Sequence, residues 1–96
     1  MYYFIVSIFQ DKKKERDEYG EYIELVKPIF EKYGGRYLVR SNKVTSLQKE
    51  YSPKRVVIIE WESKEQLEAC FSSEEYKEIA GKRENSVDSR AMIVEG

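Results

Sequence analysis

The chain has 96 residues, of which 41% are hydrophobic and 36% are charged. So short a chain has surface for only one core, which predicts a single domain over residues 1–96. Its 17 lysines and arginines nearly balance its 18 acidic residues, so the basic excess that is typical of nucleic-acid-binding proteins is absent.

Three further features of the composition narrow the function classes. The single cysteine, Cys70, excludes an internal disulfide and a cysteine-cluster metal site. Histidine, the most common general base and metal ligand, is absent, so we expect no metal and no cofactor. No segment approaches the roughly 18 apolar residues of a membrane span, and Met1 leads directly into a strand-like segment. We therefore expect a cytoplasmic protein that contacts neither nucleic acid nor membrane.

The first two predicted elements are a strand and a helix. Residues 2–9 are aromatic or β-branched almost throughout, which indicates a strand buried on both faces. From about Glu15 to Tyr33, apolar residues recur every three or four positions, which is typical of a helix with one buried stripe. Pro28 lies inside this pattern and should bend or locally break the helix, because it removes a backbone donor.

A glycine pair separates this helix from the second predicted strand. Gly34 and Gly35 follow the helix, where a left-handed C-cap favours glycine, so they do not predict a phosphate-binding loop. Residues 36–40 form the second strand, and simple alternation places Arg36 and Arg40 on the same face.

The third strand is preceded by a break in the pattern. Ser41-Asn42 marks a turn or bulge, and residues 44–49 are predicted to form a short extended arm. Residues 56–62 then form the third strand, which is again continuously apolar up to Glu60.

The last part of the chain predicts a helical region and a final strand. Ser63 and Gln66 have the spacing of a capping box and start the helix. A second helical segment begins at Ser72 or Ser73 and frays beyond Gly81. Residues 91–94 form the last, short strand.

This order of elements predicts an α+β fold of the ferredoxin-like βαββαβ type with an antiparallel sheet. Right-handed crossovers place the first and third strands at the centre of the sheet. Both helices pack on one face, so the other face carries Val56 and Ile58 without cover. Because an exposed apolar sheet face is unusual for a monomer, we expect a homodimer in which two sheets pack face to face.

Glu60 is the candidate catalytic residue, because a carboxylate in an apolar central strand needs a partner. Alternation places Glu60 on the uncovered face, and Arg36 and Arg40 of the neighbouring strand are its expected partners. Tyr3 and Ser7 join them if the first strand has the matching register. These residues predict a pocket between the sheets for a small anionic organic ligand, held by arginine, with Glu60 as proton acceptor.

These residues also have structural interpretations. A buried Glu60–Arg40 pair is the structural alternative, and it fixes the strand register or the dimer interface. Arg83 either reaches the mouth of the pocket or binds carbonyl groups at a helix C-terminus. Trp61 and Cys70 are expected in the core.

Four segments carry a pattern that extends over nearly the whole chain. They are Tyr33-Gly34-Gly35-Arg36-Tyr37-Leu38-Val39-Arg40, Pro53-Lys54-Arg55-Val56-Val57-Ile58-Ile59-Glu60, Ser73-Glu74-Glu75-Tyr76 followed by Arg83, and Val94-Glu95-Gly96. In this order they resemble the family called domain of unknown function 1330. The resemblance implies the dimeric α/β-barrel superfamily, in which two ferredoxin-like protomers pack their sheets together.

The resemblance does not by itself imply an activity. Relatives in that superfamily include antibiotic-biosynthesis monooxygenases, muconolactone isomerases, chlorite dismutases and stress-response barrel proteins, and function does not transfer across so varied a set. The chain also departs from the family pattern. Ser7 stands where many members carry an acid, Trp61-Glu62 replaces the usual Phe-Pro, and Glu74 replaces a proline. The missing first-strand acid disfavours a mechanism with two carboxylates.

We therefore expect a homodimer that binds a small anionic metabolite between its sheets. The alternative is a cofactor-independent monooxygenase- or isomerase-like enzyme, with Glu60 as base and Arg40 stabilising an enolate or oxyanion. An RNA-binding module shares the topology, but the aromatic and basic strand that it requires is not found in Val56–Ile59.

Overall fold

The sheet has four antiparallel strands in the order β2-β3-β1-β4. The computed structural model describes residues 1–11 and 18–96, and their side chains except at positions 10, 11, 18–21 and 83–87. The strands are β1 (Tyr2–Asp11), β2 (Arg36–Ser41), β3 (Arg55–Trp61) and β4 (Val87–Glu95). The helices are α1 (Glu18–Lys32), α2 (Lys64–Ser72) and α3 (Glu74–Ser86). The predicted ferredoxin-like α+β fold is confirmed, with β1 and β3 at the centre of the sheet.

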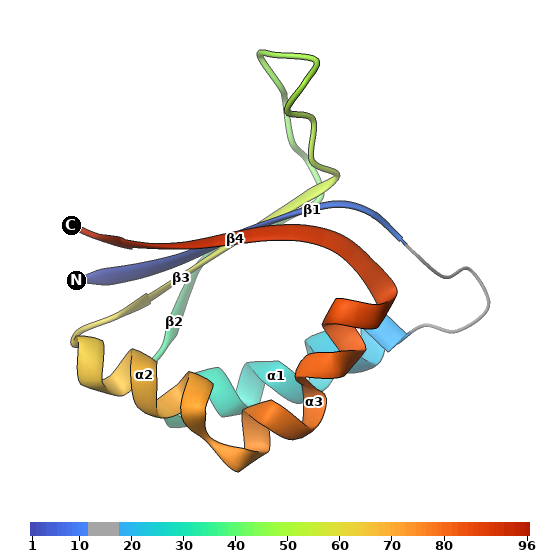
Figure 1. Cartoon of the computed structure of the whole chain (residues 1–96). Coiled ribbons are helices and arrows are strands. Elements are labelled where there is room, and N and C mark those ends of the chain that lie inside the picture. Colours follow the sequence, from blue (N-terminus) through green and yellow to red (C-terminus); the bar gives the residue numbers. More distant parts are fainter. Residues whose placement is uncertain (12–17) are drawn as a thin grey trace.

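One face of the sheet is covered and the other is not. Figure 1 shows α1, α2 and α3 on the same side of the sheet, while the loop of residues 42–54 projects from the opposite side. We call the side without helices the open face. None of the described helices is long and apolar enough to cross a membrane.

The core forms between the covered face and the helices. Successive side chains of a strand point to opposite faces, so alternate residues of β1 and β3 enter this core. Its buried members include Phe4, Val6 and Ile8 of β1, Val57, Ile59 and Trp61 of β3, and Tyr22, Val26 and Phe30 of α1. Burial of each large apolar side chain contributes roughly 1.5–3 kcal/mol.

Helix α1 continues through Pro28 without a break. Pro28 is exposed, so its ring lies on the solvent side and disturbs no core contact. The predicted helix start at Glu15 lies outside the described residues.

Gly34 and Gly35 end α1 as predicted. Gly34 has a φ of +90°, and the N–H groups of Gly34 and Gly35 bond to the carbonyls of Glu31 and Phe30. This is the hydrogen-bond pattern of a Schellman motif. A Cβ on Gly35 would lie 2.9 Å from the Trp61 ring, so the turn also needs a glycine for close packing on β3.

Serine side chains start the two later helices. Ser63 accepts a bond from the Gln66 N–H at 3.2 Å, and Ser73 accepts one from the Tyr76 N–H at 3.1 Å. Ser73 therefore begins the second helical segment, which was predicted to begin at Ser72 or Ser73. That segment does not fray at Gly81: α3 runs to Ser86 and β4 follows at once. The last strand is longer than the predicted residues 91–94, because β4 pairs with β1 from Val87 to Glu95.

An irregularity in β2 changes the side-chain alternation along this strand. Arg36 lies opposite Glu60 and Tyr37 opposite Ile59, but Val39, not Leu38, lies opposite Ile58. Leu38 is therefore an extra residue, a β-bulge. After the bulge, Arg40 lies opposite Val57 and shares the covered face with it.

The loop of residues 42–54 is fixed at its base to β1, although it projects from the sheet (Figure 1). The Lys54 N–H bonds to the Ile8 carbonyl at 2.8 Å, and the Tyr51 ring packs against Phe9 with centroids 5.4 Å apart. The predicted extended arm, residues 44–49, lies within this segment, but the segment is irregular, with an isolated bridge that joins Gln48 to Tyr51. We call residues 42–54 the arm.

Candidate functional site

Glu60 lies on the open face in a cross-strand row with Arg36 and Tyr3. Arg36 and Tyr3 are its direct neighbours on β2 and β1. Glu60 is 6% exposed, and Arg36 donates two hydrogen bonds to its Oε1, that from Nε measuring 2.9 Å. The hydrogen bond to Glu60, and then the charge of Glu60, raise the pKa of Arg36. The carboxylate therefore has an ion-pair partner, but that partner is Arg36 and not Arg40.

The prediction that Arg36 and Arg40 share a face is wrong. The extra residue Leu38 breaks the alternation between them, so Arg40 points to the covered face. Within one protomer, Glu60 and Arg40 consequently lie on opposite sides of the sheet. The structural alternative of a Glu60–Arg40 pair does not form.

Ser7 is on the open face with Tyr3 but does not meet it. The two residues are four positions apart in β1, so their Cα atoms lie about 13 Å from each other. The buried Ser7 hydroxyl instead forms a hydrogen bond of 2.5 Å with the hydroxyl of Tyr51 in the arm. Ser7 thus helps to fix the arm to the sheet.

Arg83 belongs to α3, but its side chain lies outside the described part of the molecule. Neither sequence interpretation of Arg83 is therefore tested. Of the six predicted site residues, the structure brings together Arg36, Glu60 and Tyr3.

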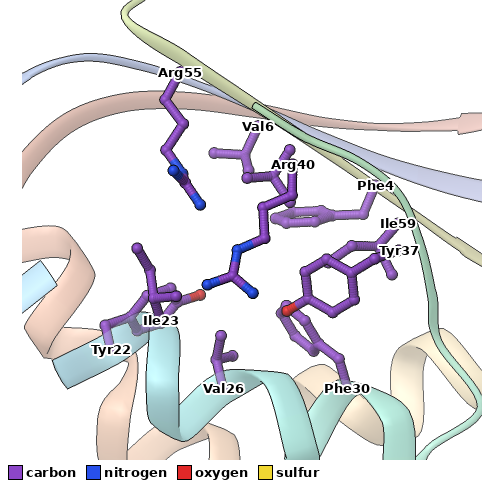
Figure 2. Close-up of a pocket in the computed structure, with 11 residues that line it drawn as sticks. Phe4, Val6, Tyr22, Ile23, Val26, Phe30, Tyr37, Arg40, Arg55 and Ile59 are labelled. Carbon is purple, nitrogen blue, oxygen red and sulfur yellow. The ribbon is translucent and has the colours of Figure 1, made fainter. Parts of the chain in front are cut away.

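A different site lies between the covered face and α1. A cavity of about 30 Å³, partly open to solvent at the exposed Arg40, is lined there by residues of β1, β2, β3 and α1. Figure 2 shows Arg40 extending from β2 into this cavity toward α1, with the Tyr22 and Tyr37 rings on either side. Arg55 enters from the start of β3 (Figure 2). Apart from these two arginines and two tyrosines, the wall consists of apolar residues: Phe4, Val6, Ile23, Val26, Phe30, Val57 and Ile59.

Arg55, which lines this cavity, has an unused hydrogen-bond donor. Its Nη1 donates to Asn42 Oδ1 at 2.6 Å, at the root of the arm. Its Nε is buried and has no acceptor among the described residues. A buried N–H without an acceptor is costly, so such a group in a native fold requires an explanation.

Arg40 has an aromatic neighbour at the cavity. Its guanidinium carbon lies 6.0 Å from the centroid of the Tyr37 ring, a cation–π distance. Among the ion pairs of the described residues, none joins a carboxylate to Arg40 or Arg55. Two cations therefore face an otherwise uncharged wall.

Arg55 was missed in the sequence, although the signal for it was present. Alternation from Val57 and Ile59 places Arg55 on the covered face, because β3 is regular. We did not expect a cation there, because the covered face was treated as core.

The remaining reactive groups do not extend the site. The thiol of Cys70 is fully buried, and burial raises its pKa to about 12, so the thiolate is disfavoured at neutral pH. Trp61 Nε1 also lacks an acceptor among the described residues, but Trp61 does not line the cavity. Within residues 1–11 and 18–96, no cluster of His, Cys, Asp or Glu could hold a metal ion.

Comparison with known families identifies the chain. The family described as "Domain of unknown function (DUF1330)" matches residues 2–96. The chain belongs to the DUF1330 family. No curated protein matches it.

Solved structures share the fold of this DUF1330 protein. The RPA0582 protein of Rhodopseudomonas palustris, of unknown function, is 18% identical with a TM-score of 0.79, over 97% of this chain and 80% of that chain. The At3g17210 protein of Arabidopsis thaliana is 13% identical with a TM-score of 0.71, over 99% and 93%. A putative antibiotic biosynthesis monooxygenase of Nitrosomonas europaea is 17% identical with a TM-score of 0.57, over 100% and 98%. At these identities the likeness concerns the fold alone.

Proposed function

We propose that this DUF1330 protein binds a small organic anion in the cavity between the sheet and α1. The observation that carries the proposal is the buried Nε of Arg55, which lacks an acceptor among the described residues and belongs to a side chain that lines a largely apolar cavity. An anionic oxygen supplies such an acceptor, and bonds between ionised groups are the stronger ones. Arg40 provides a second guanidinium on the same side of the sheet.

This proposal keeps the anionic ligand that the sequence predicted but moves its site. Arg40 remains a ligand-binding residue, and Arg55 replaces Arg36 as its companion. Glu60, Tyr3 and Ser7 belong to the open face, where Glu60 is already paired with Arg36. We propose binding rather than catalysis, because no carboxylate among the described residues lines the cavity to act as a base.

We further propose that two protomers pair through their open faces. Val39, Met92 and Val94 are exposed there, and Leu47 in the arm is 97% exposed. Exposed apolar side chains on one face of a sheet are typical of protein–protein contacts. A pocket of about 340 Å³ beneath the arm, with Val44, Tyr51 and Val56 in its wall, adds apolar surface for a partner to cover. The single free cysteine fits the cytoplasmic location predicted from the sequence.

Enrichment of organic acids from a cell extract tests the binding function. The dialysed protein is incubated with the small-molecule fraction of an extract, recovered and denatured, and the released acids are identified by mass spectrometry. Arg55→Gln is compared with Arg36→Gln, a matched change on the open face.

We expect wild type and Arg36→Gln to enrich the same acid and Arg55→Gln to lose it at least tenfold. Loss of one hydrogen bond to a charged group, worth about 1.5–3 kcal/mol, corresponds to this factor. Equal recovery from all three proteins, or from none, contradicts the proposal.

A further inference from the structure

The cavity provides charge for one anionic group only. Arg40 and Arg55 are the two cations of its described wall, and both enter at the end of the sheet where the arm begins. A planar guanidinium matches the two oxygens of a carboxylate. Beyond the arginines the wall consists of the uncharged Tyr22 and Tyr37 and of apolar side chains, so a second charge would be buried without an ion-pair partner, at high cost.

The size of the cavity limits what is attached to that carboxylate. A single water molecule needs roughly 10–15 Å³ measured in the same way. The volume of about 30 Å³ therefore accommodates two or three atoms of the size of a methylene group. An aromatic ring needs far more, since a cavity that binds benzene measures about 150 Å³.

From the charge and the volume together, we propose that the ligand is a short-chain aliphatic monocarboxylate. Its carboxylate lies at the mouth of the cavity, beside the exposed Arg40, and accepts hydrogen bonds from Arg55 Nε and from the Arg40 guanidinium. A tail of two or three carbons alone fills the volume of the cavity. This inference rests on the proposed binding function and specifies its ligand class.

Val26 sets the depth of the tail in this arrangement. It belongs to α1, is 3% exposed and lines the cavity opposite the sheet (Figure 2). Val26→Ala removes two methyl groups from the wall without harming helix propensity. The preceding residue, Leu25, is 45% exposed and does not line the cavity, so Leu25→Ala is the matched control.

The test is a calorimetric titration with the sodium salts of the straight-chain acids from formate to hexanoate, at constant ionic strength. Three further compounds serve for comparison. Butyramide has an uncharged amide in place of the carboxylate, succinate has a second carboxylate, and benzoate has an aromatic ring in place of the aliphatic tail. Each methylene that becomes buried should strengthen binding about fourfold. We expect affinity to rise up to propionate or butyrate and to fall for hexanoate, with the three comparison compounds at least tenfold weaker than butyrate.

The variants separate the ligand class from the binding function. We expect Arg55→Gln to weaken the binding of butyrate at least tenfold. We expect Val26→Ala to shift the tightest binding to an acid with a longer chain, and Leu25→Ala to leave the preferred chain length unchanged. If succinate or benzoate binds best and still depends on Arg55, the ligand class is wrong and the binding function stands. If butyrate binds wild type and Arg55→Gln equally, or if no acid binds wild type, both are wrong.

Discussion

Glu60 and Arg55 lie near opposite ends of β3 and on opposite faces of the sheet. Glu60 faces the open side and is held by Arg36, whose side chain is 70% exposed. Arg55 faces the covered side, and its Nε has no acceptor among the described residues. Because their side chains lie on different faces of one sheet, substitutions at the two positions should affect different properties.

Glu60→Gln tests whether Glu60 is structural. We expect the variant to bind the enriched acid within twofold of wild type, because the carboxylate does not line the cavity. We also expect a lower urea midpoint, since the ion pair with Arg36 is lost while the amide remains buried. Loss of acid binding with an unchanged midpoint contradicts this and returns Glu60 to the catalytic role suggested by the sequence.

Cys70 gives the protein a pH-dependent term in its stability. Burial raises the thiol pKa from 9.0 to about 12, so between these values the unfolded chain releases a proton that the folded chain keeps. The contribution is complete below pH 9 and is lost as the pH rises toward 12, at roughly 1 kcal/mol per pH unit. From pH 9 to 11, the unfolding free energy of wild type should therefore fall relative to that of Cys70→Ala, by roughly 1 kcal/mol per pH unit. A constant difference contradicts it.

The sequence predicted individual residues well where alternation was undisturbed. Val56, Ile58 and Glu60 lie on the open face as expected, because β3 is regular. Arg40 was placed on the wrong face, because a bulge adds one residue to β2 and no local pattern distinguished Leu38 from its neighbours. The predicted site therefore combined residues from both faces of the sheet.

At the scale of elements, the helix caps were predicted correctly and the boundary between α3 and β4 was not. Gly34-Gly35 and Ser73 act as the expected caps. The boundary between α3 and β4 was missed, because residues 81–90 are mostly polar in sequence and residues 87–90 form a strand through pairing with β1. Tertiary pairing of this kind overrides local propensity.

Pro28 provides an element-scale prediction. Proline inside a helix costs about 3 kcal/mol relative to alanine, and Pro28 is exposed, so the substitution removes no core packing. We expect Pro28→Ala to raise the unfolding free energy by about 1–3 kcal/mol, measured by urea denaturation. A destabilised variant would show instead that α1 needs proline at this position.

The open face is the main feature of the whole molecule. Helices cover one side of the sheet, and the arm stands at one end of the other side (Figure 1). The exposed apolar residues of this face agree with the pairing expected from the sequence, but one chain alone does not test it. The number of protomers in solution is therefore a prediction.

Met92→Glu tests this pairing. Met92 is 56% exposed and lies on the open face beside Ile5, in the edge strand β4, so a charge there should weaken the dimer at least tenfold. Leu25→Glu is the matched control, because Leu25 is similarly exposed but lies on α1. Sedimentation equilibrium should give a dimer for wild type and Leu25→Glu. A monomeric wild type at micromolar concentration contradicts the pairing.

The most direct test of the anion site is a ¹⁵N NMR titration of the arginine Nε–H signals with the acid that wild type enriches. We predict that the Arg55 Nε–H signal shifts and saturates, because that donor gains an acceptor, while the Arg36 Nε–H signal stays on Glu60 and does not move. A shift of Arg36 with Arg55 unchanged would place the anion on the open face and contradict the site between the sheet and α1.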